Sequence, residues 1–151
     1  MKTILIGAIA ALITGLAIGM QATLSSRAGS IIGSVRTGLL TNLIGGSIAG
    51  LIVLIMIIIA GSTSWRIPIT PLIMISSGGM LGILIVTGVS FSLQRVGISA
   101  GLATIIFGQM LLSVIIDTKG IGGAEPITLS FQRITGLVLL ILSIYLLLPK
   151  K

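Results

Sequence analysis

Five long apolar runs, separated by short polar links, make up nearly the whole chain. Each run is continuous, and most are close to the roughly 20 residues that a helix needs to cross a hydrocarbon core of about 30 Å. They do not show the short alternating segments of a membrane barrel, and a helix satisfies its backbone hydrogen bonds internally. We therefore predict an all-α integral membrane protein, a single membrane domain over residues 1–151, with helices at about 4–24, 37–60, 69–92, 98–116 and 134–148.

The polar links are short, and we expect them to lie at the membrane surface. The predicted link from Ser25 to Arg36 carries two arginines, and the one from Gly61 to Pro68 holds Trp65, a residue type enriched at membrane interfaces. The longest link, Asp117 to Gln132, contains both acids of the chain. Little of the sequence remains for a soluble domain.

Small residues recur at helical spacing along several of the predicted spans. A stripe of small side chains on one face lets a second helix backbone approach closely, which is a common mode of packing in membranes. We expect these positions to serve helix packing. They are Gly7, Ala11, Gly15, Gly19, Gly38, Gly46, Gly50, Gly78, Gly82 and Gly101.

Amide side chains are the most informative polar groups, because Asn42 and Gln109 fall inside predicted spans. An unpaired polar group in hydrocarbon is costly, so each should face a partner or a cavity. Ser113 lies one turn beyond Gln109 on the same line. Gln21 stands near the end of the first span, where hydration at headgroup depth explains it equally well. We take all four as candidates for a substrate cavity.

The residue types that are missing narrow the chemistry. The chain has no cysteine and no histidine, so we expect no metal site, no cofactor and no enzyme activity. No carboxylate or lysine falls in the middle of a span, which argues against a proton relay. Asp117, at the end of the fourth run, is expected to pair with Lys119 or Arg133. Aromatic residues make up only 3% of the chain, too few for a cage around a quaternary ammonium group.

Charge affects the expected assembly more than the expected fold. Hydrophobic residues make up 55% of the chain, and the net charge of +7 comes from nine basic residues scattered singly between apolar runs. That distribution fits contact with lipid headgroups rather than nucleic acid. With five spans, four basic residues lie on one side of the membrane and five on the other: Lys2, Arg66, Lys119 and Arg133 against Arg27, Arg36, Arg95, Lys150 and Lys151.

Such a balance predicts a weak preference for either orientation. If both orientations insert, the natural closed assembly is an antiparallel homodimer with its two-fold axis in the membrane plane. This dimer would be an inverted repeat made from two chains, an architecture that secondary transporters use around a site near the midplane. A paralogous chain in place of the second copy is the alternative.

Three segments resemble the YdcZ-like family of the drug/metabolite transporter superfamily. They are Ala17 to Ala22 leading into Ser26 and Arg27, Gly108 to Asp117, and Gln132 to Gly136. The resemblance implies a multi-pass protein of the cytoplasmic (inner) membrane and half of a ten-helix transporter. Carried over by position, it implies functional roles for Gln21, Arg27, Asn42, Gln109 and Asp117. The sequence departs from the family where Ser25 and Ser26 stand, since an asparagine usually precedes the arginine there.

Three functions compete on this basis. The first is a dimeric transporter of a small neutral or amphipathic solute through a midplane cavity. The second is an accessory subunit whose glycine stripes serve only packing against another membrane protein. The third is a cation/proton exporter like the small multidrug resistance proteins, which the missing glutamate in the first span disfavours. We expect the transporter.

Overall fold

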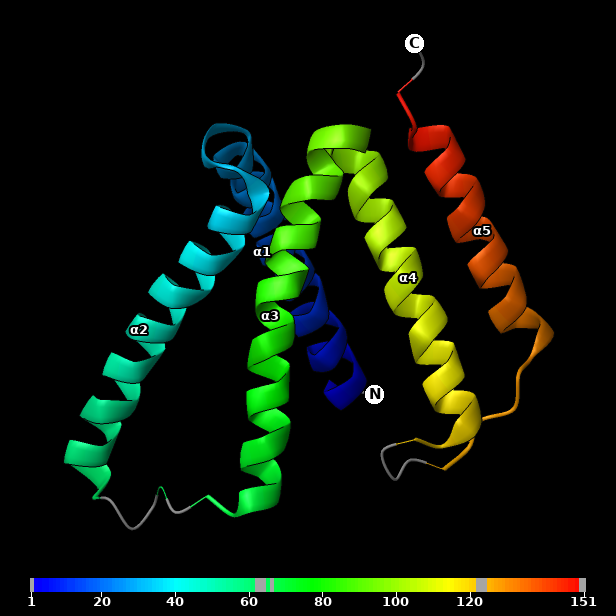
Figure 1. Cartoon of the computed structure of the whole chain (residues 1–151). Coiled ribbons are helices and arrows are strands. Elements are labelled where there is room, and N and C mark those ends of the chain that lie inside the picture. The colour runs from blue at the N-terminus through cyan, green and yellow to red at the C-terminus, as the bar shows by residue number, and fades with distance from the viewer. Residues whose placement is uncertain (1, 62–64, 66, 122–124, 150–151) are drawn as a thin grey trace. The chain divides into compact units, whose positions relative to one another are not determined.

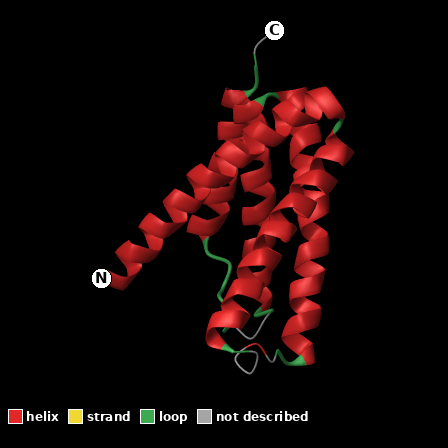
Figure 2. Ribbon diagram, turned by 90° about the vertical axis from the view of Figure 1, so that its left-hand side faces the viewer, coloured by secondary structure: helices red, strands yellow, loops and turns green. Residues whose placement is uncertain are grey.

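In the part of the chain that it describes, the computed structural model confirms an all-helical fold, with five helices in the order that the apolar runs predict (Figure 1). It describes residues 2–61, 65, 67–121 and 125–149. Figure 2 shows helices joined by loops, with no strand in this described part of the chain. The helices are α1 (Lys2–Ile32), α2 (Ser34–Ala60), α3 (Ile69–Val96), α4 (Ile98–Lys119) and α5 (Phe131–Leu147).

The helices have the length and surface of membrane spans. Four of them, α1 to α4, are long and apolar enough to cross a bilayer, whereas α5 has 17 residues, which is at the lower limit. Large apolar side chains point outward along them: Ile4, Ile59 and Phe131 are 78%, 80% and 83% exposed. Contiguous apolar surface on this scale is not stable in water. The predicted membrane protein is therefore confirmed.

Two helix boundaries lie far from the predicted ones because the links are much shorter than polarity suggests. The predicted link from Ser25 to Arg36 is helical except at Gly33, and Gly97 alone separates α3 from α4. Both glycines have φ near +85° with extended ψ, a conformation almost confined to glycine. Each donates its N–H to the carbonyl four residues before and accepts from the N–H four residues after, so one residue ends a helix and starts the next.

The chain divides into two compact units, Met1–Phe91 and Ser92–Lys151. In the first unit α1 packs against α2, and in the second α4 packs against α5. The prediction of a single membrane domain stays a prediction.

The first unit is tightest near the Gly33 turn. Apart from glycines, five small residues of this unit are buried there, four of them with hydroxyl groups, and we call them the corner cluster: Ala22, Ser25, Ser26, Thr37 and Ser90. The Ser90 hydroxyl donates to the Ser25 carbonyl at 2.9 Å, which ties α3 to α1. The Thr37 hydroxyl donates to the Gly33 carbonyl at 3.0 Å. Small side chains that satisfy backbone carbonyls thus replace a large hydrophobic core.

Candidate functional site

A groove of about 660 Å³ opens between α2 and α3 within the first unit. The two helices touch at Gly38, where a β-carbon would collide with the Thr87 hydroxyl and lie 3.0 Å from the Thr87 nitrogen. Figure 1 shows them diverging from this end toward the other. No large side chain fills the gap, because several lining residues are glycine or alanine. The lining consists of Leu39, Asn42, Leu43, Gly45, Gly46 and Ala49 of α2 and Gly79 and Ile83 of α3.

Asn42 has the only polar side chain among the residues that line this groove. Its Nδ2 donates to the Gly38 carbonyl at 2.8 Å, within its own helix. Its Oδ1 faces α3 at Gly82, where an added β-carbon would lie 2.8 Å away. The side chain is half-buried. Asn42 therefore stands at the narrow end of the groove, where its amide oxygen accepts no hydrogen bond from a described residue.

Gln21 lies in a separate, small pocket of about 50 Å³ between α1 and α3. Its neighbours there include Ala22 and Ser25 of the corner cluster and Val89 of α3. Its amide has no hydrogen-bond partner among the described residues. Arg27 is exposed on α1. Neither residue lines the α2–α3 groove, so the structure separates them from Asn42.

Three candidates of the second unit form one line along α4. Gln109, Ser113 and Asp117 are each four residues apart and so lie on one helix face. Gln109 is exposed and Ser113 is half-buried. Neither side chain has a hydrogen-bond partner within the described chain. In a membrane, an amide without a hydrogen-bond partner is costly.

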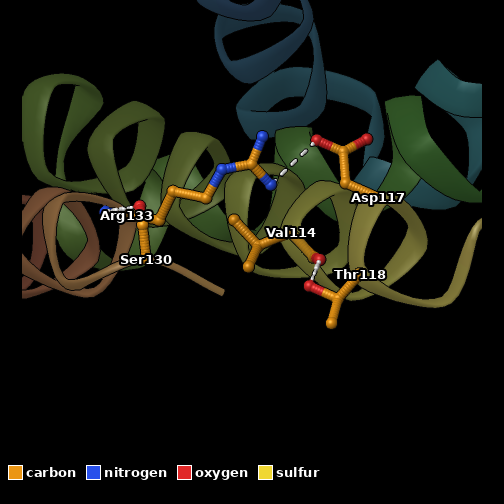
Figure 3. A network of polar contacts seen from close by, with 5 residues as sticks. All are labelled: Val114, Asp117, Thr118, Ser130 and Arg133. Atoms are coloured by element: carbon orange, nitrogen blue, oxygen red, sulfur yellow. Dashed lines mark hydrogen bonds and ion pairs between the residues drawn. The ribbon is translucent and has the colours of Figure 1, made fainter. Parts of the chain in front are cut away.

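Asp117 pairs with Arg133 rather than with Lys119 (Figure 3). Asp117 Oδ2 and Arg133 Nη1 are 3.3 Å apart, and the side chains are 38% and 28% exposed. Nη1 is itself buried and lacks hydrogen-bond geometry to any acceptor among the described residues. Ser130 caps α5 by accepting from the Arg133 backbone N–H at 3.4 Å. The pair connects the end of α4 to the start of α5.

The expected packing positions fall into two groups. A β-carbon at Gly38, Gly82 or Gly101 would meet atoms of a neighbouring segment at 3.2 Å or less. At the other glycines, no described atom beyond the glycine's own stretch of helix lies within 4 Å of the β-carbon position, and Ala11 is exposed. Those without a neighbour are Gly7, Gly15, Gly19, Gly46, Gly50 and Gly78.

Sequence reasoning missed two residues that shape the groove. Thr87 forms the contact with Gly38, and Gly45 lines the groove beside Gly46. Gly45 is not one of the residues that recur every four positions on α2, such as Gly46 and Gly50, so the periodicity of small residues does not identify it. Thr87 carried a weak signal only, since a threonine in a span usually bonds its own helix. Within the described part, no three Asp, Glu, His or Cys side chains gather where they could hold a metal ion.

Comparison with models of protein families matches residues 6–146 to the family described as "Putative inner membrane exporter, YdcZ". The match covers nearly all of the chain. It confirms the resemblance drawn from the three segments and the inner membrane location. A transporter family also favours a role without catalysis. No curated protein and no solved structure matches the chain.

Proposed function

The chain belongs to the YdcZ family of inner membrane exporters, and from this premise we propose that it exports a small neutral or amphipathic solute as a dual-topology antiparallel homodimer. The transporter role follows from the family. The solute class, the dimer and the cavity are the proposal. A single observation carries it, namely the groove of about 660 Å³ between α2 and α3 with Asn42 at its narrow end.

The lining of this groove supports an uncharged solute. It holds one amide, three glycines and four apolar side chains, and no charged residue. A charged solute would lose its hydration there without gaining a counter-charge. A neutral solute with one hydrogen-bond donor could instead pair with Asn42 Oδ1 and lie against the glycine backbone. A few convergent polar groups in an apolar pocket are typical of small-molecule sites.

Three features of the chain support a second copy. Gln109 has no partner among the described residues although it lies within α4. Six glycines of the expected packing stripes have no neighbour in the described chain. The numbers of basic residues on the two sides of the membrane differ by only one. An oppositely oriented copy would supply the partner helices and make the inverted repeat that transporters commonly use.

Solute flux into liposomes tests the proposal. The full chain is reconstituted and offered a panel of glycerol, neutral sugars, small amides and amphipathic dyes. Asn42→Ala should lower the flux of the transported solute about tenfold, since one buried hydrogen bond is worth about 1–1.5 kcal/mol. Ser47→Ala is the matched control, because Ser47 is exposed and bonds only the Leu43 carbonyl. No flux of any solute, or unchanged flux in Asn42→Ala, would contradict the proposal.

Cysteine labelling tests the dimer separately. The chain has no native cysteine, so Ser30→Cys and Thr128→Cys place single thiols at opposite ends of the spans. An impermeant maleimide applied to intact cells should label about half of each pool if both orientations coexist. Labelling of only one variant would mean a fixed topology, and a paralogous partner or an accessory role would replace the homodimer.

A further inference from the structure

A second groove, within the second unit, is lined by apolar atoms and ends at a lysine. We propose that the α4–α5 groove binds one anionic phospholipid, with an acyl chain among its apolar side chains and the headgroup phosphate at Lys119. The volume is about 300 Å³. The lining comprises Leu111, Val114, Ile115, Thr118 and Lys119 of α4, Leu129 of the following link, and Ile134 and Leu137 of α5.

The groove is lined by apolar atoms and runs toward the polar end of α4, where Asp117, Thr118 and Lys119 stand. Its five residues on α4 lie at helical spacing on one face and span about 12 Å along the axis, at 1.5 Å per residue. Leu111 stands at one end of this span, and Thr118 and Lys119 stand at the end of the helix. The polar link that follows puts this end at headgroup depth. A lipid placed along the bilayer normal would match this arrangement.

The walls of the groove are held by backbone hydrogen bonds. The Ile121 N–H donates to the Ile116 carbonyl at 3.1 Å and closes α4 in a Schellman motif with Gly120 in the left-handed region. The Ile127 N–H donates to the Asp117 carbonyl at 2.9 Å, which brings the link back to α4 before Leu129. The Asp117–Arg133 pair then anchors the start of α5. The groove is therefore built before any ligand enters.

The charge beside the groove favours an anionic headgroup. Asp117 is engaged with Arg133, and Lys119 has no ion-pair partner within the described chain. The Thr118 hydroxyl donates to the Val114 carbonyl at 2.7 Å (Figure 3), so its proton is already used. Lys119 is thus the cation available to a phosphate. A phosphatidylglycerol headgroup lacks the compensating ammonium of phosphatidylcholine, so Lys119 should distinguish the two.

Native mass spectrometry of the purified full chain tests the headgroup. Binding of phosphatidylglycerol is compared with that of phosphatidylcholine, in the wild type and in Lys119→Gln. We expect the affinity for phosphatidylglycerol to fall about fivefold, as for the loss of one basic residue near a lipid surface, and that for phosphatidylcholine to stay unchanged. Arg36→Gln is the control, because it removes an exposed cation from α2, far from this groove in the sequence. Equal losses in both variants, or none in Lys119→Gln, would overturn the proposal.

A second pair of variants tests the acyl chain. Leu137→Trp fills the groove, whereas Leu139→Trp adds the same ring at a position that is 58% exposed and outside the lining. Only Leu137→Trp should lower phosphatidylglycerol binding, with helical content by circular dichroism unchanged in both. If Leu137→Trp binds normally while inorganic phosphate competes with the lipid, the site recognises phosphate alone and the lipid proposal fails.

Discussion

The two ends of α2 have the same small-residue pattern and opposite surroundings. Gly38, near the Gly33 turn, is buried against Thr87 of α3. Gly50, three turns further along α2, has no described atom beyond its own stretch of helix within 4 Å of its β-carbon position. The stripe of small residues therefore has two effects along α2. At the narrow end of the groove it lets α2 pack against α3, and at the wide end it leaves the groove unfilled.

The core of the narrow end differs in kind from that of a soluble protein. The corner cluster buries hydroxyl groups, and Ser90 is fully buried. In a membrane the lipid offers apolar surface on every side, so apolar burial does not hold helices together, and close packing and hydrogen bonds take its place. At the wide end, Gly46 and Gly50 have no close neighbour on another described helix. Substitutions at the two ends should consequently have unequal effects.

The largest effect is expected for Gly38→Ala. The added methyl group would collide with the Thr87 hydroxyl and lie 3.0 and 3.1 Å from the Thr87 nitrogen and the Ile83 oxygen. Backbone atoms cannot move aside without separating the helices, so we expect a loss of about 3 kcal/mol in the free energy of unfolding. Titration with SDS in mixed micelles, followed by circular dichroism, measures it.

Gly50→Ala is the matched control at the wide end. It should leave the free energy of unfolding of the monomer unchanged or slightly raised, since alanine favours helix. An equal loss in the free energy of unfolding in Gly38→Ala and Gly50→Ala would contradict the proposed difference in packing between the two ends of α2. A loss that depends on protein concentration would instead place Gly50 in the dimer interface.

A smaller effect is expected for Gly33→Ala. Gly33 has φ of 89° and ψ of 146°, which a residue with a β-carbon adopts only under strain of about 1–3 kcal/mol. We expect a loss of about 2 kcal/mol in the same titration. Gly88→Ala, within α3 and with no atom near its β-carbon position, should cost nothing. A tolerated Gly33→Ala would mean that the turn is not held in this conformation.

The smallest of the three effects is expected for Ser90→Ala. The substitution removes the hydrogen bond to the Ser25 carbonyl and should cost about 1 kcal/mol. Ser76→Ala is the control, because Ser76 is exposed and bonds only the Leu72 carbonyl of its own helix. If both variants unfold alike, the bond between α3 and α1 does not contribute to the narrow end.

The number and order of the helices could be predicted from apolar runs, but the first turn could not. Hydropathy averages over many residues, and Ser25 to Arg36 is polar enough to look like a surface link. In the structure Ser25 and Ser26 are buried in the corner cluster and only Gly33 leaves the helix. Polarity therefore misplaces the helix boundary here, because hydroxyl side chains are buried between helices. The backbone conformation of Gly33 has no signal in the hydropathy pattern.

The candidate residues were predictable one by one, but their grouping was not. Asn42 and Gln109 stood out because an amide inside a span needs a partner. The sequence left Asp117 with two possible partners, and only the path of the link to Arg133 decides between them. The groove itself depends on the angle between α2 and α3. That angle follows from the contact of Gly38 with Thr87, which lies 49 positions away in the chain.

The one-residue turn at Gly33 has a consequence for biogenesis. Because α1 and α2 have no loop between them, they can enter the bilayer together as a helical hairpin, without moving a hydrophilic segment through it. The barrier to inverting this hairpin during synthesis then comes mainly from Arg27 and Arg36, the charged residues flanking the turn. The same compact turn also offers a protease no extended loop to cut between α1 and α2.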